Sequence, residues 1–228
     1  MIDNSQTCLV IPAFNEAESL AVLLPQVIDK VTKVIVVDNG STDDTSNVAR
    51  IAGAQVINEP RRGYGQACLA GIQAALPCDI VIFMDADLCD DPEFLQALIS
   101  PLLEGDADFV LGSRMGAEAK KYLSPIQRHG NRFACWLMRL RWQSTYTDLG
   151  PFRAISTMAL EKLNMSDTNY GWTVEMQIKA VRLELCIQEI SVPYCHRQFG
   201  CSTVSGTLTG IIKAGAKILY VIAREAFR

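Results

Sequence analysis

Short apolar runs alternate with amphipathic stretches along most of the chain. Runs of four to eight apolar residues that end in polar residues are typical of strands buried on both faces. The strands are expected near residues 7–12, 33–38, 54–57, 79–84, 107–112, 150–155 and 185–192. The helices are expected near residues 16–29, 43–52, 65–76, 92–103, 126–141, 157–163, 173–183 and 207–225. This alternation predicts an α/β protein with a mostly parallel sheet and helices on both faces.

Composition and charge favour one globular α/β domain over residues 1–228. A chain of 228 residues with 49% hydrophobic and 20% charged positions can bury a substantial core. The formal net charge of −4 argues against a nucleic-acid partner and against general attraction to anionic membranes. Residues 1–7 are mostly polar and carry no secretory signal, so we expect a cytoplasmic protein, or one peripheral on the cytosolic membrane face.

The eight cysteines are scattered and form no Cys-x-x-Cys pair. Several lie in apolar runs, so we expect reduced core residues, and neither a structural zinc site nor a disulfide framework. His129 and His196 are far apart in the sequence and do not suggest a metal site.

The acidic pair Asp85 and Asp87 is the strongest chemical signal in the chain. It follows the apolar run at 80–84, where two carboxylates at the end of a buried strand can reach one metal ion. Ligands of open α/β sheets bind at this edge, and a divalent cation there would hold a diphosphate. A lone Asp-x-Asp also fits a simple turn, so this interpretation depends on other segments.

Three more segments place polar groups or glycines beside predicted strand ends. Asp38 could accept a hydrogen bond from a nucleobase, and Glu16 or Asn39 could contact the base or the ribose. Gly63 and Gly65 would let the backbone approach a ligand closely. Each residue also has a structural explanation as a helix cap or a turn. The order and spacing of the segments together are more specific.

Together these segments resemble glycosyltransferase family 2 of the GT-A fold, and they are most similar to the branch of dolichyl- and polyprenyl-phosphate sugar synthases. The matching segments cover most of the chain. They are Pro-Ala-Phe-Asn-Glu at 12–16, Val-Val-Asp-Asn-Gly-Ser at 36–41, Gly-Tyr-Gly at 63–65 with Ala67, Asp-Ala-Asp at 85–87, Gly-Ser-Arg at 112–114, Asp-Leu-Gly-Pro-Phe-Arg at 148–153, and Arg197 with Gly200 and Ser202. The resemblance implies a three-layer α/β/α sandwich with a mostly parallel central sheet.

The resemblance also implies an inverting hexosyltransferase that uses Mg²⁺ or Mn²⁺. It would move mannose or glucose from GDP-mannose or UDP-glucose to a polyprenyl phosphate. Asp87 would be the direct metal ligand, and Asp85 would support the metal or the sugar and ribose hydroxyls. The implied donor-binding residues are Pro12, Asn15, Glu16, Asp38, Asn39, Gly63, Gly65, Asp85 and Ala86. A soluble acceptor, a nucleotidyltransferase activity and a non-catalytic sugar-nucleotide sensor remain alternatives.

An acceptor phosphate needs cations rather than a general base, because it is already ionised near neutral pH. Arginine suits this task through bidentate pairing. The resemblance points to Arg114 and Arg197, with Arg128 behind them and Ser202 as a further contact. Asp148 would be the base with an alcohol acceptor and would orient the sugar with a phosphate acceptor. The implied catalytic residues are Asp87, Arg114, Asp148 and Arg197.

Two positions depart from the branch. Cys89 stands where relatives often have Gln, and a thiol is a poor ligand for Mg²⁺ or Mn²⁺, so Asp90, Asp91 or water would replace it. Thr203 stands where relatives tend to have Lys, which removes one expected cation.

Two segments near the expected site have open interpretations. The stretch 116–125 is a lid over the site or a plain surface loop. The segment 207–225 is an amphipathic basic helix, which lies on a membrane surface or packs on the domain and is too short for a confident span.

Overall fold

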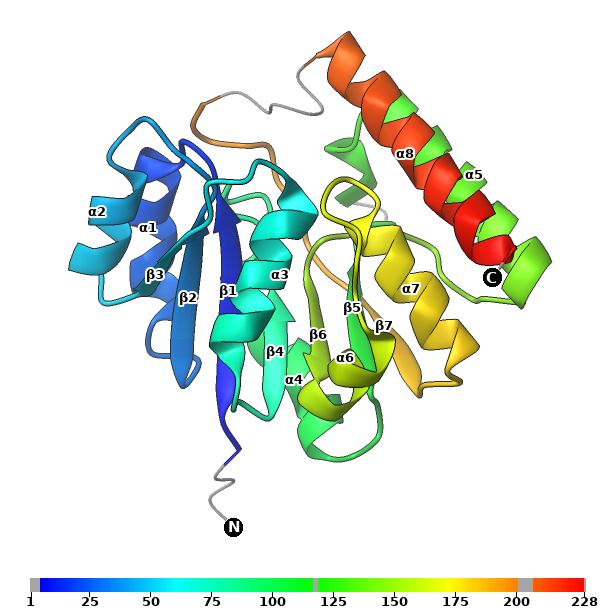
Figure 1. Ribbon diagram of the computed structural model, residues 1–228, viewed down its shortest axis with the longest axis horizontal. Coiled ribbons are helices and arrows are strands. Elements are labelled where there is room, and N and C mark those ends of the chain that lie inside the picture. Colours follow the sequence, from blue (N-terminus) through cyan, green and yellow to red (C-terminus); the bar gives the residue numbers. More distant parts are fainter. Residues whose placement is uncertain (1–4, 117–118, 201–206, 228) are drawn as a thin grey trace.

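The computed structural model describes residues 5–116, 119–200 and 207–227, which build one seven-stranded sheet with helices on both faces (Figure 1). The strands are β1 (Thr7–Ala13), β2 (Lys33–Asp38), β3 (Gln55–Asn58), β4 (Ile80–Phe83), β5 (Phe109–Ser113), β6 (Arg153–Ser156) and β7 (Ile187–Ser191). The α-helices are α1 (Ala17–Val27), α2 (Thr45–Ile51), α3 (Tyr64–Ala75), α4 (Leu95–Leu103), α5 (Pro125–Trp142), α6 (Thr157–Leu163), α7 (Trp172–Arg182) and α8 (Leu208–Ala226). Two 3₁₀ turns are η1 (Pro92–Phe94) and η2 (Ala119–Lys121).

The sheet has the order β3-β2-β1-β4-β6-β5-β7. All its pairings are parallel except those of β6, which runs antiparallel to both β4 and β5. The predicted mostly parallel α/β sheet is therefore confirmed. Since β1, β2 and β4 are parallel neighbours, the residues that follow them gather at one edge, which is the upper edge in Figure 1.

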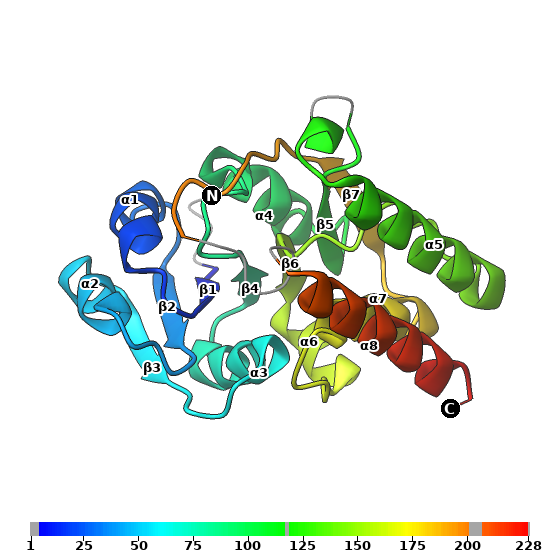
Figure 2. The same ribbon diagram turned by 90° about the horizontal axis from the view of Figure 1, so that it is seen from above.

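Two apolar cores lie on the two faces of the sheet, and successive strand residues alternate between them. Val10 and Phe83 point into the core beneath α3, α6 and α7, whereas Leu9 and Ile82 point into the core beneath α1, α2 and α4. The view from above shows the three layers (Figure 2). The predicted α/β/α sandwich is therefore confirmed.

Helix α3 packs so closely on the sheet that one position tolerates only glycine. A Cβ at Gly71 would lie 2.3 Å from Val10 Cγ1 and 3.2 Å from Val37 Cγ2. We expect Gly71→Ala to lower the free energy of unfolding by about 1–3 kcal/mol through overpacking. Gly130 in α5 has no atom near its Cβ position, so Gly130→Ala should raise the free energy of unfolding by about 0.5–1 kcal/mol. Urea unfolding followed by circular dichroism measures both free energies of unfolding. If Gly71→Ala stabilised the protein as much as Gly130→Ala, the close packing at Gly71 would be contradicted.

Helices α5 and α8 run side by side in the same direction and contact α7 (Figures 1 and 2). At their C-terminal ends, Arg141 Nη2 donates to the Ala226 carbonyl over 3.2 Å. The predicted helix at 207–225 is present, and it buries Val221 and Ile222. Among the described residues, no helix combines the length and the apolar character that a membrane span requires.

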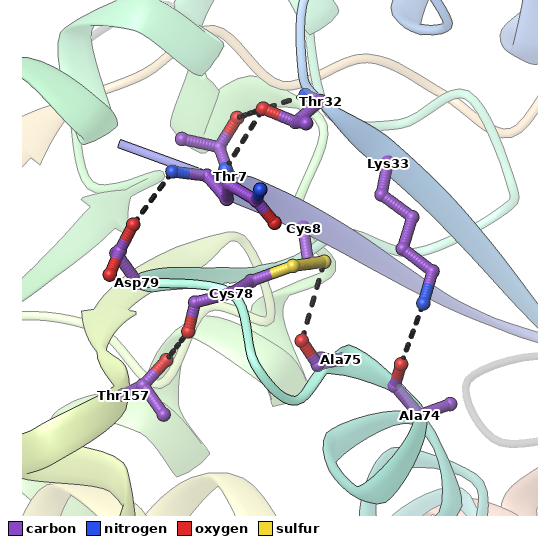
Figure 3. Close-up of a disulfide and its surroundings, with 10 residues drawn as sticks. Thr7, Cys8, Thr32, Lys33, Ala74, Ala75, Cys78, Asp79 and Thr157 are labelled. Atoms are coloured by element: carbon purple, nitrogen blue, oxygen red, sulfur yellow. Dashed lines mark hydrogen bonds between the residues drawn. A yellow bond between two sulfur atoms is a disulfide. The ribbon is translucent and has the colours of Figure 1, made fainter. Parts of the chain in front are cut away.

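The expectation of reduced cysteines is wrong for one pair. Cys8 in β1 and Cys78 before β4 form a disulfide, with their Cα atoms 6.1 Å apart (Figure 3). They are 70 residues apart in the sequence, and only the pairing of β1 with β4 brings them together. The other described cysteines are free: Cys68, Cys89, Cys135, Cys186 and Cys195.

Candidate active site

A cavity of about 610 Å³ opens at the C-terminal ends of β1, β2 and β4. Sequence reasoning had selected nine of its lining residues, because each follows a predicted strand or a matched segment. They are Pro12, Glu16, Asn39, Gly63, Asp85, Ala86, Asp87, Arg114 and Arg197. The sheet therefore brings together groups that are spread over about four fifths of the chain.

The acidic pair lies in the cavity directly after β4. Asp85 Oδ1 is buried and has no hydrogen-bond partner among the described residues. Burial, and then the neighbouring Asp87 carboxylate, raise the pKa of Asp85 to about 7. Asp87 Oδ1 accepts a hydrogen bond from the Cys89 backbone N–H over 3.1 Å. An unpartnered carboxylate oxygen beside a second carboxylate is an arrangement that a bound cation would stabilise.

Arg197 closes the other side of the acidic pair. Its Nη2 lies 2.7 Å from Glu16 Oε1 and 3.4 Å from Asp87 Oδ2. This guanidinium therefore joins the start of α1 to the loop after β4, and it partly neutralises Asp87. A diphosphate that enters the cavity would meet the same guanidinium group of Arg197.

Arg114 and Asp148 form a buried bidentate pair beneath the cavity. Arg114 Nε donates to Asp148 Oδ2 over 2.8 Å, and Arg114 Nη2 donates to Asp148 Oδ1 over 3.0 Å. Asp148 Oδ1 also accepts from Asn131 Nδ2 and from the Leu149 backbone N–H. The ring of Tyr194 lies 5.0 Å from the Arg114 guanidinium carbon.

This pair changes the role predicted for Asp148. Asp148 has no exposed surface and does not line the cavity, whereas Arg114 does. The geometry gives Asp148 no direct contact with a sugar in the cavity. Its carboxylate fixes the guanidinium of Arg114 at the cavity wall.

Three of the residues predicted to contact the donor accept hydrogen bonds from backbone N–H groups. Asp38 Oδ1 accepts from the Ser41 backbone N–H over 2.8 Å, and Asn15 Oδ1 accepts from the Thr42 backbone N–H over 2.8 Å. Neither side chain lines the cavity. Asn39 Oδ1 accepts from the Gly63 backbone N–H over 2.8 Å, so it holds the loop before α3 in place.

The two glycines before and in α3 pack closely against the backbone at 167–169. A Cβ at Gly63 would lie 2.2 Å from the Thr168 carbonyl oxygen, and one at Gly65 would lie 2.2 Å from the Asp167 carbonyl oxygen. Gly63 also has φ of 147°, which favours glycine. Only Gly63 lines the cavity, so the closest approach at Gly65 is to the protein's own backbone.

The comparisons with known proteins identify the family. Residues 8–163 match the family described as "Glycosyl transferase family 2". An uncharacterised glycosyltransferase of Mycobacterium tuberculosis is 38% identical over 206 residues, which are 90% of this chain and 93% of that protein. This chain belongs to glycosyl transferase family 2. An undecaprenyl-phosphate mannosyltransferase of Micrococcus luteus is 29% identical over 216 residues, which are 88% of each chain.

Solved structures of glucosyl-3-phosphoglycerate synthase from Mycobacterium tuberculosis have the same fold as this family 2 transferase. The complex of that enzyme with Mn²⁺, UDP-glucose and phosphoglyceric acid has a TM-score of 0.80 and 24% identity, and it covers 98% of this chain and 80% of that chain. Its complex with Mg²⁺ and UDP has a TM-score of 0.78. The likeness confirms the GT-A fold.

The residues after the acidic pair differ in whether their side chains already have partners. Burial raises the pKa of the Cys89 thiol, so the sulfur stays protonated and is a poor metal ligand. Asp91 caps η1 by accepting from the Glu93 backbone N–H over 2.9 Å. Asp90 is 3% exposed, and neither of its carboxylate oxygens has a hydrogen-bond partner among the described residues.

A cation at this site of the transferase would need ligands besides protein side chains. In the described part of the chain, no three His, Cys, Asp or Glu residues are arranged to hold a metal ion. Asp85 and Asp87 supply oxygen atoms, which Mg²⁺ and Mn²⁺ prefer. Diphosphate oxygens and water are the natural complement to two carboxylates.

Sequence reasoning missed the aromatic and polar residues that complete the cavity. Phe14 lies within a matched segment, and the Arg62 guanidinium stacks on its ring at 3.7 Å, so this pair could have been found. Tyr64, Leu149 and Pro151 also lie within matched segments. The others come from helices and loops without a recognisable motif, and they are Gln127, Asn169, Tyr170, Thr173, Tyr194 and Ala214.

The remaining predicted residues do not line the cavity or lie outside the described residues. Arg128 in α5 is half-buried and does not line the cavity, although its neighbour Gln127 does. Ser202 and the departure at Thr203 lie outside the described residues. The stretch 116–125, predicted as a lid or a surface loop, contains η2 and does not line the cavity in its described part.

Proposed function

We propose that this family 2 transferase moves a hexose from a nucleoside-diphosphate sugar to an acceptor that carries a phosphate group. The observation that carries the proposal is the acidic pair at the cavity, where Asp85 Oδ1 has no partner among the described residues and its pKa is raised to about 7. Asp85 and Asp87 would hold a divalent cation there. When bound, the cation neutralises the charge that develops on the leaving diphosphate.

The residues of this chain would orient the donor and stabilise its charge. The edge formed by Pro12, Phe14 and Asn39 with the loop at Arg62 and Gly63 offers backbone groups, an aromatic ring and a guanidinium to a base and ribose. When a diphosphate binds, Arg197 would turn toward it, and its ion pairs with Glu16 and Asp87 would weaken. The Mn²⁺, Mg²⁺ and UDP named for the solved complexes support this assignment.

Arg114 is the proposed cation for the acceptor phosphate. Asp148 already fixes its guanidinium, so little conformational entropy is lost when a phosphate binds. A phosphate acceptor also suits the cavity because an ionised phosphate needs no strong base to attack the sugar.

A soluble phosphorylated acceptor is the better supported of two candidates. The solved complexes of the same fold contain phosphoglyceric acid. A polyprenyl phosphate is the second candidate, and it is favoured by the sequence relative that is an undecaprenyl-phosphate mannosyltransferase. Both molecules present a phosphate group to the same cations.

The test is transfer from UDP-glucose and GDP-mannose, with phosphoglycerate or a short polyprenyl phosphate as acceptor and Mn²⁺ or Mg²⁺ present. Release of nucleoside diphosphate that requires one of the acceptors is the expected result. Release of pyrophosphate would instead identify a nucleotidyltransferase. Donor binding without release under every acceptor would identify a sugar-nucleotide sensor, and either outcome would overturn the proposal.

Removal of divalent cations should abolish transfer. We expect EDTA to lower the rate by at least about 100-fold, because the diphosphate charge is then opposed only by arginine side chains. Manganese or magnesium added in excess should restore the rate, whereas sodium at equal ionic strength should not. Full activity in EDTA would contradict the assignment of Asp85 and Asp87 as metal ligands.

A further inference from the structure

The exposed apolar side chains of this protein are concentrated on α5 and α8. Eight of the fifteen exposed large apolar side chains among the described residues lie on these two helices or directly after them. Those of α5 are Ile126, Phe133, Trp136 and Leu140. Those of α8 and its C-cap are Ile212, Leu219, Tyr220 and Phe227. We call this set the apolar face.

Helical periodicity places each group on one side of its helix. At 3.6 residues per turn, the four positions of α5 fall within an arc of about 80°, and the four of α8 within about 100°. Phe133 and Trp136 stack with ring centroids 5.8 Å apart. The opposite side of α5 buries Ala134, Cys135 and Met138. The apolar face is therefore the side that each helix turns away from the domain.

The two stripes form one continuous surface. Leu140 and Leu219 line the same groove of about 410 Å³ between the helices, together with Leu137 and Ile222. Other sides of the same two helices reach the active site near their N-terminal ends, because Gln127 of α5 and Ala214 of α8 both line the cavity. Ile126 and Ile212 lie near the N-terminal ends of α5 and α8, while Phe227 follows the last residue of α8.

The charge of this region is opposite to that of the rest of the protein. Helices α5 and α8 carry seven of the chain's 21 Lys and Arg residues but only one of its 25 Asp and Glu residues. That acid, Glu225, has a side chain only 1% exposed and pairs with Arg182. Arg132, Arg139 and Lys213 are exposed and flank the apolar face.

We propose that the apolar face and its flanking basic side chains bind the surface of an anionic phospholipid bilayer. Apolar side chains bordered by Lys and Arg suit the boundary between acyl chains and anionic headgroups. A second copy of this chain fits less well, because it would bring two basic surfaces together. The proposal of a lipid-binding surface depends only on these exposed side chains. The link between that surface and a lipid-linked acceptor rests on the proposed function. A bilayer at this surface would place the cavity mouth beside a lipid-linked phosphate.

Vesicle sedimentation tests the proposal. The intact protein should sediment with vesicles that contain about 30% phosphatidylglycerol, and less with pure phosphatidylcholine, because the anionic headgroups attract the basic side chains. Leu140→Glu should lower the ratio of bound to free protein by about tenfold, because it removes apolar burial and adds a repelled charge. The matched control is Ile51→Glu in α2, which changes an aliphatic residue that is even more exposed and lies far from the apolar face, and it should bind like the wild type.

Tryptophan fluorescence gives a second readout of the same contact. Trp136 is exposed, Trp142 is half-buried and Trp172 is fully buried, so brominated lipid should quench mainly the Trp136 emission. Trp136→Phe should lose this quenching and still sediment with the vesicles.

Three results would overturn the proposal. They are no sedimentation with anionic vesicles, equal sedimentation of Leu140→Glu and Ile51→Glu, and a dimer in analytical ultracentrifugation that Leu140→Glu dissociates. The last would assign the face to a second copy.

Donor binding by Leu140→Glu, measured without lipid, should equal that of the wild type. Absence of donor binding in the wild type would refute the proposed function and leave the vesicle result unaffected.

Discussion

Asp87→Asn should nearly abolish sugar transfer, with a fall in kcat of roughly 1,000-fold. The substitution keeps the size of the side chain but removes the charge that would hold a divalent cation beside the leaving diphosphate. It also removes the partner that lies 3.4 Å from Arg197 Nη2. Because Asp87 contacts the loop after β4 rather than the core, the free energy of unfolding should change little.

The measurements are kcat with saturating donor and titration calorimetry of Mn²⁺ with nucleoside diphosphate. Asp91→Asn is the matched control, because it removes a carboxylate four residues away that caps η1 and does not line the cavity. That control should keep its activity and lose about 1 kcal/mol of stability at most. Normal Mn²⁺-dependent binding by Asp87→Asn would refute its role as a ligand.

Asp148→Asn should lower both stability and activity. The carboxylate accepts hydrogen bonds from Arg114, Asn131 and the Leu149 backbone, and an amide cannot satisfy all these donors or balance the guanidinium. Leaving a buried charge without its partner costs about 3–5 kcal/mol, which we expect to be lost from the free energy of unfolding. Transfer should fall by roughly 100-fold, because Arg114 is no longer fixed at the cavity wall.

The pH dependence of unfolding adds a distinct signature. Burial alone would raise the pKa of Asp148, but the charge and hydrogen bonds of Arg114 lower it below its usual value of 3.8. A carboxyl whose pKa is lowered on folding stabilises the protein above that value, and this contribution is lost as pH falls through the folded pKa. The wild type should therefore lose stability below about pH 4, and Asp148→Asn should lose less over the same range.

A double variant separates structure from chemistry. Arg114→Met combined with Asp148→Asn removes the uncompensated charge, so part of the lost stability should return. Activity should not return, because the proposed acceptor cation is missing. Recovery of transfer in the double variant would show that Arg114 does not bind the acceptor phosphate.

The local pattern of the sequence was sufficient to predict the sheet and the position of the site. Apolar runs such as 80–84 are read directly as buried strands, because burial on both faces requires apolar residues at every position. The polar groups that follow these strands share one edge in any parallel arrangement. Asp85, Asp87 and Glu16 therefore reach the cavity as predicted, whatever the details of the loops.

Pairings between distant side chains could not be predicted in this way. The sequence pointed to Asp148 as a base or as a residue that orients the sugar, and only the antiparallel insertion of β6 next to β5 places it against Arg114, 34 residues earlier. The sequence pointed to Asp38 as a base-binding residue and did not show that its carboxylate also accepts hydrogen bonds from Ser41 and Ser46. The disulfide between Cys8 and Cys78 likewise depends on the neighbouring positions of β1 and β4.

The sequence by itself determined the α/β alternation, the family and the acidic pair at a strand end, because each depends on residues close together in the chain. The tertiary structure decided which polar groups face the cavity and which support one another beneath it. It also decided that α5 and α8 lie side by side with their apolar face exposed. The amphipathic pattern of one helix shows that it has an apolar side, but only packing against α7 decides which side remains uncovered.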